Sequence, residues 1–277
     1  MKLALIQQHA TPDRDGNVKR GIQAIGEAAK QGANCACFAE LAFDRFFPQQ
    51  PASGDVARLA EPVPGPTTDA FCALAREHGM VIVLNLYEQD GSKLYDSSPV
   101  IDADGTLLGC TRMIHIADLP CFHEKGYYAP GDTGAPMYET SIGRIGVAIC
   151  YDRHFPEYMR ALGVQGAQLV LVPQAGGVDE WPEGLYEAEM RVAAFQNGYY
   201  VALCNRVGAE ECLTFAGESF VCKPDGTVLT RAPREQDHLL LADLDFSLVA
   251  QSHARRLFIP DRRPDLYGSW VSCQAKE

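Results

Sequence analysis

The feature that most constrains this chain is a short apolar run that ends at a cysteine and continues directly into a charged turn. Residues 144–157 read Arg-Ile-Gly-Val-Ala-Ile-Cys-Tyr-Asp-Arg-His-Phe-Pro-Glu. The apolar part predicts a strand, and the closing Pro-Glu pair is typical of a helix N-terminus. We expect the bend to expose the Cys150 thiol beside backbone amides, which favour a thiolate and later an oxyanion.

The alternative for Cys150 is an ordinary buried thiol. Three polar or charged residues follow the cysteine closely, namely Asp152, Arg153 and His154. Burying these side chains together would cost free energy. The sequence therefore favours Cys150 as an accessible nucleophile.

Two glutamates are candidate proton carriers. Glu40 ends a second apolar run, between Ala39 and Leu41. Partial desolvation at such a position raises the pKa of a carboxyl group and makes it a usable general base, although a surface acid at a strand end is the alternative. Glu124 lies in a loop-like segment, where by itself a solvated acid is the default interpretation.

Composition excludes several classes of function. The chain has 277 residues, 47% of them hydrophobic, and a formal net charge of −12, with basic residues that do not cluster. Binding to nucleic acid or to anionic membranes is therefore not expected. No apolar run approaches the ~20 residues that span a bilayer. The ten cysteines contain no CxxC pair and lie mostly in strand-like runs, which predicts buried thiols in a cytoplasmic protein without a metal site.

Strand and helix signals alternate along the chain. We expect a single layered α/β domain over residues 1–277, with a core to about residue 250 and a tail, 251–277, at a subunit interface. Segments 42–66 and 117–141 are expected to be active-site loops. Helices are expected at 17–31, 67–78, 156–164 and 183–197. Strands are expected at 2–7, 35–38, 80–86, 94–101, 106–116, 144–150, 169–173, 199–204, 219–222, 227–230 and 239–244.

Together these segments resemble the nitrilase superfamily of carbon–nitrogen hydrolases. The resemblance rests on the order of several short segments: 3–7, the strand ending at Glu40, the Glu-Lys-Gly-Tyr-Tyr-Ala-Pro-Gly-Asp run from 124, 149–157, 205–208, and Asp-Arg-Arg-Pro-Asp-Leu-Tyr at 261–267. The last segment is similar to the N-carbamoylputrescine amidase and β-ureidopropionase side of the family. The resemblance implies an αββα sandwich that dimerises into four layers, often assembles further, and needs no cofactor.

The resemblance also implies roles for individual residues. Cys150 would attack an amide or carbamoyl carbon, and Glu40 would carry the proton from the thiol to the leaving amine. Glu124 would orient the substrate and support proton transfer, and the backbone N–H of Tyr151 would help to bind the oxyanion. These roles agree with the general pairing of a nucleophile with a base.

One position departs from the family pattern. In residues 109–115, Gly-Cys-Thr-Arg-Met-Ile-His, Met113 stands where the family's oxyanion-stabilising lysine is expected. Methionine has no proton to donate, and the loss of one oxyanion donor typically costs ~10²–10³ in rate. Lys125 would have to turn inward to replace it, Arg112 would point to the opposite strand face, and His115 would share the face of Met113. There are three explanations for methionine at this position: the enzyme uses another donor, it acts on a changed substrate, or the protein is catalytically silent.

Clues to the substrate are fewer. The resemblance implies that Arg153 holds a substrate carboxylate, which a guanidinium can bind bidentately. A salt bridge to Asp152 or Glu157 is an equal alternative. His115 is a further candidate substrate-binding residue.

The segment that closes the pocket in the family contains Trp181, Glu183 and Glu187. Acidic residues there would suit an amine-bearing substrate, whereas Arg153 would suit a carboxylate. The sequence therefore predicts cysteine-dependent hydrolysis of a linear amide or N-carbamoyl compound without choosing one. The alternatives are a silent binding protein of the same fold and a true nitrilase.

Overall fold

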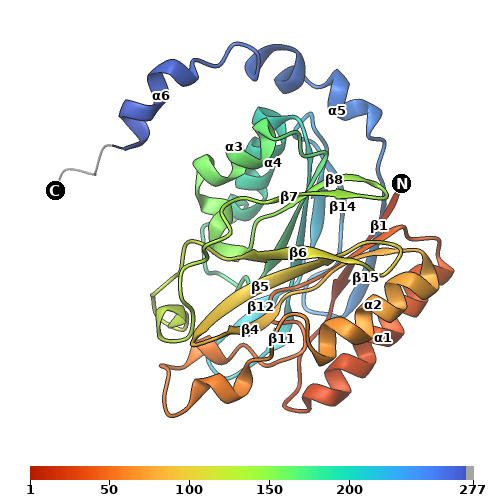
Figure 1. The fold of residues 1–277 in the computed structure, drawn as a ribbon, viewed down its shortest axis with the longest axis vertical. Coiled ribbons are helices and arrows are strands. Elements are labelled where there is room, and N and C mark those ends of the chain that lie inside the picture. The colour runs from red at the N-terminus through yellow and green to blue at the C-terminus, as the bar shows by residue number, and fades with distance from the viewer. Residues whose placement is uncertain (273–277) are drawn as a thin grey trace.

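Two β-sheets stacked face to face form the centre of the molecule in a computed structural model, which describes residues 1–272 (Figure 1). The first sheet runs in the order β15-β1-β2-β3-β5-β4, and β6 also pairs with β5. Its strands are β1 (Lys2–Gln7), β2 (Cys35–Phe38), β3 (Val81–Val83), β4 (Leu86–Asp90), β5 (Lys93–Ile101), β6 (Leu107–Arg112) and β15 (His238–Asp243).

The second sheet runs in the order β14-β13-β10-β9-β8-β7. Its strands are β7 (Met137–Thr140), β8 (Gly143–Val147), β9 (Leu169–Gln174), β10 (Tyr200–Asn205), β13 (Phe220–Cys222) and β14 (Val228–Arg231). A separate two-stranded ribbon pairs β11 (Val207–Ala209) with β12 (Thr214–Ala216). The inner faces of the two sheets share one hydrophobic cluster, to which Leu5, Val147 and Ala202 belong.

Two pairs of helices cover the outer faces of the sheets. Helices α1 (Arg14–Lys30) and α2 (Pro66–His78) pack on the first sheet, and α3 (Pro156–Val164) and α4 (Leu185–Asn197) pack on the second. The protein is therefore an αββα sandwich, as the resemblance to the nitrilase superfamily implies and in agreement with the layered α/β fold predicted from the sequence. The helix ends follow local signals: Pro66 and Pro156 are first helical residues, and Gly79 and Gly198 end helices in the left-handed region, with φ of 60° and 66°.

The parallel strands bring the candidate residues to one edge of the sandwich. Strands β1, β2 and β3 are parallel, as are β8, β9 and β10. Glu40 follows the carboxyl end of β2, Cys150 follows that of β8, and Gln174 ends β9. In layered α/β folds the carboxyl ends of parallel strands commonly position ligand-binding groups.

Several expected boundaries are wrong. The strand expected over 80–86 is two strands, β3 and β4, and the strand expected over 106–116 ends at Arg112. The strand expected over 144–150 ends at Val147, and a 3₁₀ turn, Cys150–His154, follows it. Met113 and His115 therefore do not share one face of a strand.

The chain after β15 forms an arm that leaves the body. It contains α5 (Ser247–Gln251), a π-helical turn (Ala254–Phe258) and α6 (Pro264–Val271), and α6 stands clear of the sheets in Figure 1. The last five residues of the tail named above, 273–277, lie outside the described residues. Within residues 1–272 no helix is long and apolar enough to span a membrane.

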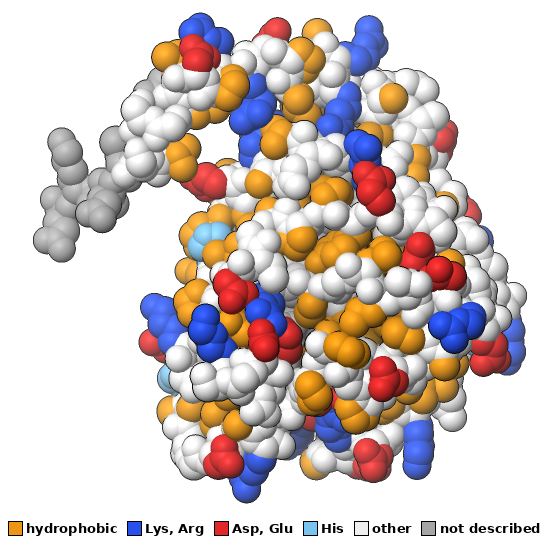
Figure 2. All heavy atoms as spheres, in the orientation of Figure 1, with side chains coloured by type: hydrophobic (Ala, Val, Ile, Leu, Met, Phe, Trp, Pro, Cys, Tyr) orange, Lys and Arg blue, Asp and Glu red, His pale blue; other side chains and the backbone are white. Residues whose placement is uncertain are grey.

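Acidic and basic side chains alternate over the face drawn in Figure 2 rather than forming a patch of one sign. This distribution agrees with the absence of clustered basic residues in the sequence. The visible face therefore offers no extended basic surface of the kind that binds a phosphate backbone.

Candidate active site

Cys150 is held in an unusual backbone conformation at the start of the 3₁₀ turn. Its φ is +41°, in the left-handed region that non-glycine residues rarely adopt. Its side chain is almost fully buried, with 6% of the residue exposed. The expectation of an exposed thiol is therefore wrong for this chain as described.

The charged residues after Cys150 are buried as well, because each has partners. Asp152 is fully buried and accepts hydrogen bonds from the ring of His115 (Nδ1 to Oδ1, 2.6 Å) and from its backbone N–H (3.0 Å). Arg153 donates from Nε to Gln174 Oε1 (2.9 Å) and forms an ion pair with Glu189. These contacts offset the cost that the sequence argument assigned to burying them.

Glu40 is fixed by its backbone rather than by its carboxyl group. The next residue, Leu41, has a φ of +43°, and its N–H donates to Asn85 Oδ1 (2.7 Å). The buried guanidinium of Arg206 donates to the carbonyl oxygen of Glu40 (2.8 Å) and is paired with Glu210. Both carboxyl oxygens of Glu40 are buried without a conventional hydrogen-bond donor among residues 1–272.

Glu124 lies in a short 3₁₀ turn, Glu124–Gly126, within the loop that the sequence assigns to the active site. Its Oε2 accepts a hydrogen bond from the backbone N–H of Ala117 (3.1 Å). Its Oε1 is buried without a partner in the described chain, as is the hydroxyl of Tyr128. Glu124 is therefore anchored on one side and free to bond a ligand on the other.

Three buried carboxyl groups interact with one another near the thiol, and two of them, Glu40 and Glu124, act on the thiol itself. Glu40 interacts with Cys150, with Asp96 on β5 and with Glu124. Burial raises the pKa of Glu40 and Glu124 well above the ordinary glutamate value, and repulsion from neighbouring carboxylates adds to the effect. Burial raises the pKa of Asp96 to about 7, although hydrogen bonds with Glu40 and Asn85 act in the opposite direction. The site is therefore a place where carboxyl groups retain protons near neutral pH.

The thiol of Cys150 is also held in its neutral form. Burial raises its pKa well above the ordinary cysteine value, and the charges of Glu40 and Glu124 raise it further, whereas Arg153 lowers it. These neighbours therefore oppose, in the resting site, the thiolate that the turn amides were expected to favour. Gln174 Nε2 lies 3.3 Å from Sγ and donates to it.

The backbone of Met113 is hydrogen-bonded to the backbone of Asp96, one of the three buried carboxyl residues. It is fully buried, its N–H donates to the carbonyl oxygen of Asp96 (2.9 Å), and its own carbonyl accepts from Gly131 N–H (2.8 Å). The side chain at this position carries no charge and no donor. None of the lysines in the described residues is buried, so no lysine takes its place in this cluster.

The three candidate replacements for the missing lysine are either bonded to other side chains or exposed to solvent. Arg112 forms ion pairs with Glu88 (2.6 Å) and Asp132 (2.9 Å). Lys125 is exposed. His115 is bonded to Asp152 and stacks on Phe155, with ring centroids 3.5 Å apart, which is a structural arrangement.

Arg153 is enclosed by protein groups. Besides its bonds to Gln174 and Glu189, its guanidinium lies 4.5 Å from the ring centroid of Tyr186. The salt bridge is therefore made with Glu189 and not with Asp152 or Glu157, the two acids considered from the sequence.

Trp181 lies between two hollows. A recess of about 10 Å³ beside Cys150 is lined by Glu124, Arg153, Glu180 and Trp181 among others. A larger cavity of about 480 Å³ shares Glu180 and Trp181 with that recess. The indole Nε1 of Trp181 is buried without a partner in the described chain. These two residues therefore line both the recess at the thiol and the larger cavity.

Sequence reasoning missed four residues of the site: Asn85, Asp96, Gln174 and Arg206. Asn85 and Gln174 each lie at or just beyond the end of an apolar strand, the same signal that identified Glu40. Asp96 lies within β5, where alternation alone does not distinguish it from a solvent-facing polar residue. Within residues 1–272 no cluster of three or more His, Cys, Asp or Glu side chains has an arrangement that holds a metal ion.

Comparisons with known proteins agree with this geometry. Residues 2–254 match the carbon–nitrogen hydrolase family. An N-carbamoylputrescine amidase of Solanum lycopersicum is 34% identical, covering 96% of this chain and 93% of its own length. The crystal structure of a carbon–nitrogen hydrolase from Helicobacter pylori G27 superimposes with a TM-score of 0.92, at 27% identity, over 99% of both chains.

In a third relative, the active-site cysteine is covalently modified. A mutant of the amidase from Nesterenkonia sp. AN1 has the acetamide moiety of fluoroacetamide covalently added at the active-site cysteine. It has a TM-score of 0.83 and 27% identity, and the match covers 98% of this chain and 96% of that one. On the family match, this chain belongs to the carbon–nitrogen hydrolases of the nitrilase superfamily and is an enzyme of that family.

Proposed function

We propose that this enzyme hydrolyses the C–N bond of a linear amide or N-carbamoyl compound through a thioester at Cys150. The observation that carries the proposal is that the buried Cys150 thiol and the buried carboxyl group of Glu40 lie close enough to act on each other's pKa. A nucleophile beside a base of raised pKa is the arrangement that acyl transfer requires. The relative modified by fluoroacetamide supports the assignment of the cysteine.

The reaction proceeds in two halves. Sγ of Cys150 attacks the carbonyl carbon while Glu40 accepts the thiol proton, and Glu40 then protonates the leaving nitrogen. In the second half Glu40 activates water against the thioester and returns the proton to the thiolate. Glu124 is proposed to orient the substrate with its unpartnered Oε1.

Tyr151 is proposed to stabilise the oxyanion. It is the second residue of the 3₁₀ turn that begins at Cys150. The first N–H groups of a helical turn lack partners within the turn, so the Tyr151 N–H is available to an oxygen on a carbon bonded to Sγ.

The substrate is proposed to enter past Trp181 from the larger cavity. That cavity is lined by acidic residues, among them Glu180, Glu187 and Glu218, and by Arg231 and Arg234. Its mixed charge suits a substrate with a polar end, such as the amine or amino-acid end of an N-carbamoyl compound. Because Arg153 is already paired with Glu189, the carboxylate-clamp role of Arg153 would require that pair to open.

The test is ammonia release from a panel of linear amides, N-carbamoyl amines and N-carbamoyl amino acids. We expect release by the wild type and none by Cys150→Ala, while Cys72→Ala, a half-exposed cysteine on α2, retains activity. Full activity in Cys150→Ala would contradict the proposal. Products of nitriles, assayed alongside, distinguish a true nitrilase.

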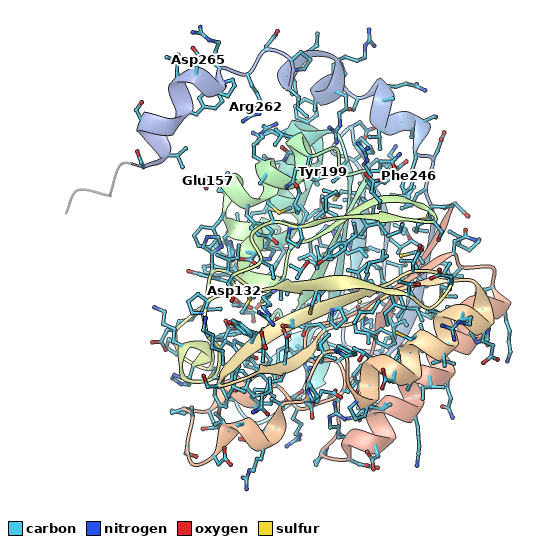
Figure 3. All side chains as sticks on the ribbon, in the orientation of Figure 1. Asp132, Glu157, Tyr199, Phe246, Arg262 and Asp265 are labelled. Atoms are coloured by element: carbon cyan, nitrogen blue, oxygen red, sulfur yellow. The ribbon has the colours of Figure 1, made fainter. Side chains whose placement is uncertain are left out.

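The protein is further proposed to form homodimers or higher homo-oligomers through α4 and the arm. Exposed apolar side chains gather there, including Val192 on α4 and Leu257 and Leu266 on the arm. Arg262 and Asp265 lie on the same arm, well away from the sheets (Figure 3). Sedimentation is expected to give a dimer-based species that Leu266→Asp weakens and that Leu229→Asp, an exposed leucine of β14, leaves intact.

The nine free cysteines of the described chain support a reducing compartment, and we place the enzyme in the cytoplasm. A catalytically silent binding protein is not favoured, since amidases and N-carbamoyl hydrolases are among its relatives.

A further inference from the structure

Asp96 and Glu40 are two buried carboxyl groups that interact with each other. Each is fully buried, and the side chain of each acts on the pKa of the other. Asp96 Oδ1 accepts from Asn85 Nδ2 (2.6 Å), so this oxygen is fixed. The remaining oxygen of Asp96 and both oxygens of Glu40 have no N–H or O–H donor among residues 1–272. Two interacting buried acceptors without such a donor need a proton between them.

Within residues 1–272, the surroundings of the pair supply no compensating cation. The groups that face it are Glu124, Asp152, Tyr128 and the Cys150 thiol, which are acidic or neutral. Arg153 acts on the thiol rather than on the pair, and Arg206 is bound to backbone oxygens and to Glu210. Met113, bonded through its backbone to Asp96, brings an apolar side chain. Two buried like charges in contact are too costly to coexist here.

We propose that Glu40 and Asp96 share one proton in the resting enzyme, and that Asp96 is a positioning residue that takes over the proton of Glu40 when Glu40 receives the thiol proton. This inference rests on the proposed function, because it concerns the same nucleophile and base. It assigns to Asp96 a part in proton transfer that it performs through Glu40 and not by touching the substrate.

The proton balance closes over both halves of the reaction. As Sγ forms its bond to the carbonyl carbon, the C=O π electrons move to oxygen, the S–H proton moves to Glu40, and the earlier proton of Glu40 moves to Asp96. The pair then holds two protons. When the C–N bond breaks, Glu40 gives one proton to the leaving nitrogen, and the pair returns to one. Water then supplies a proton as it attacks the thioester, and the departing thiolate of Cys150 recovers it.

This arrangement answers the question raised by Met113. An oxyanion forming beside two ionised carboxylates would be repelled by them. After the thiol proton has entered the pair, Glu40 and Asp96 are both neutral, so the oxyanion forms next to uncharged groups. Protonation of the pair thus reduces the repulsion that a nearby cation would otherwise offset.

The first test is the pH dependence of kcat/KM in Asp96→Asn. Burial gives Asp96 a pKa of about 7, so wild-type activity rises as the pair passes from two protons to one near that pH. The amide of Asn cannot accept the proton and donates to ionised Glu40, which lowers the pKa of Glu40. We expect kcat to fall about tenfold or more and the rise to move to lower pH by about one unit or more.

The matched control is Asp90→Asn, the same change at an exposed carboxylate on β4. It is expected to keep the wild-type profile. An Asp96→Asn profile that coincides with that of the wild type, at unchanged kcat, would overturn the proposal and leave Asp96 a purely structural residue.

A second measurement detects the proton shared by Glu40 and Asp96 in the absence of catalytic turnover. Infrared spectra of Cys150→Ala protein, recorded across pH, follow the carbonyl stretch of protonated carboxyl groups. We expect a loss of this band near pH 7 that Asp96→Asn removes. Should Asp96→Asn fail to fold, Glu40→Gln is expected to remove the same step, because it also eliminates the pair.

The outcomes separate the two proposals. A step near pH 7 that survives both replacements belongs to another group, such as Glu124, and overturns the shared proton. A step that disappears in both, in a protein that hydrolyses none of the panel, supports the shared proton and instead contradicts the proposed function.

Discussion

Gln174 joins the nucleophile to the charged residue that follows it. Its Nε2 donates to Sγ of Cys150 across 3.3 Å, while its Oε1 accepts from Nε of Arg153 at 2.9 Å. Because an amide cannot turn without breaking both bonds, Gln174 sets the direction from which its donor meets the sulfur. Gln174 is the last residue of β9, so the sheet itself positions this contact.

Replacing Gln174 by Met is therefore expected to slow the thiol chemistry. The variant keeps the length of the side chain but loses the donor that stabilises negative charge on sulfur. We predict about a tenfold lower rate of alkylation by fluoroacetamide, measured by intact mass. Gln165→Met, at the exposed residue that caps the C-terminus of α3, should alkylate at the wild-type rate; equal rates in all three proteins would argue against the role of Gln174.

Introducing a lysine at Met113 should change the titration of the site. An ammonium group beside Glu40 and Asp96 would favour their ionised forms and lower their pKa. The acid limb of the kcat/KM profile should then move to lower pH by about one unit or more. Met113→Leu, which nearly conserves volume, is expected to cost less than about 1.5 kcal/mol and to leave the limb in place. The same acid limb in Met113→Lys and wild type would contradict this prediction.

The buried carboxyl pair should also make folding stability depend on pH. The pKa of Asp96 is raised from 3.8 to about 7 on folding, so the folded state binds the proton more tightly than the unfolded state. The stabilisation is present below about pH 4 and is lost as pH rises through about 7, by an amount on the order of 4 kcal/mol.

Urea denaturation of wild type and Asp96→Asn, at several pH values, measures this term as a difference between the two proteins. The free energy of unfolding of the wild type should fall relative to the variant as pH rises through this range. A constant difference would mean that Asp96 does not take up a proton on folding.

Trp181 should control which substrates reach the thiol. Together with Glu180 it lines both the small recess at Cys150 and the larger cavity. Trp181→Ala is predicted to raise the relative kcat/KM for bulkier amides by several-fold to about tenfold, since it removes a large side chain that lines both cavities. Glu183→Ala, exposed in the same segment, is the control, and an unchanged ratio of bulky to small amides in Trp181→Ala would refute a gating role.

The layered fold was predictable because its apolar runs alternate with amphipathic segments. Cys35–Phe38 and Leu169–Gln174 are continuous apolar or nearly apolar runs, as buried parallel strands require, and the end of the first run identified Glu40. The bend after Cys150 was predicted, but its burial was not. Local sequence does not reveal that Asp152 finds His115, which is 37 residues away.

The composition of the site was predictable only in part for the same reason. Asp96 reaches Glu40 through the pairing of β5 with β3 and of β3 with β2, a tertiary relationship. The charge of the site was therefore misjudged, since a thiolate was expected where neighbouring carboxyl groups hold the thiol neutral.

The central claim is that Cys150 forms the covalent intermediate with Glu40 as its base. The most direct measurement is intact mass after incubation with fluoroacetamide, together with ammonia release from the amide panel, for wild type, Cys150→Ala and Cys72→Ala. The account predicts one added acetamide moiety and ammonia release in wild type and Cys72→Ala, and neither in Cys150→Ala. Addition at a different residue, with ammonia release that survives in Cys150→Ala, would contradict it.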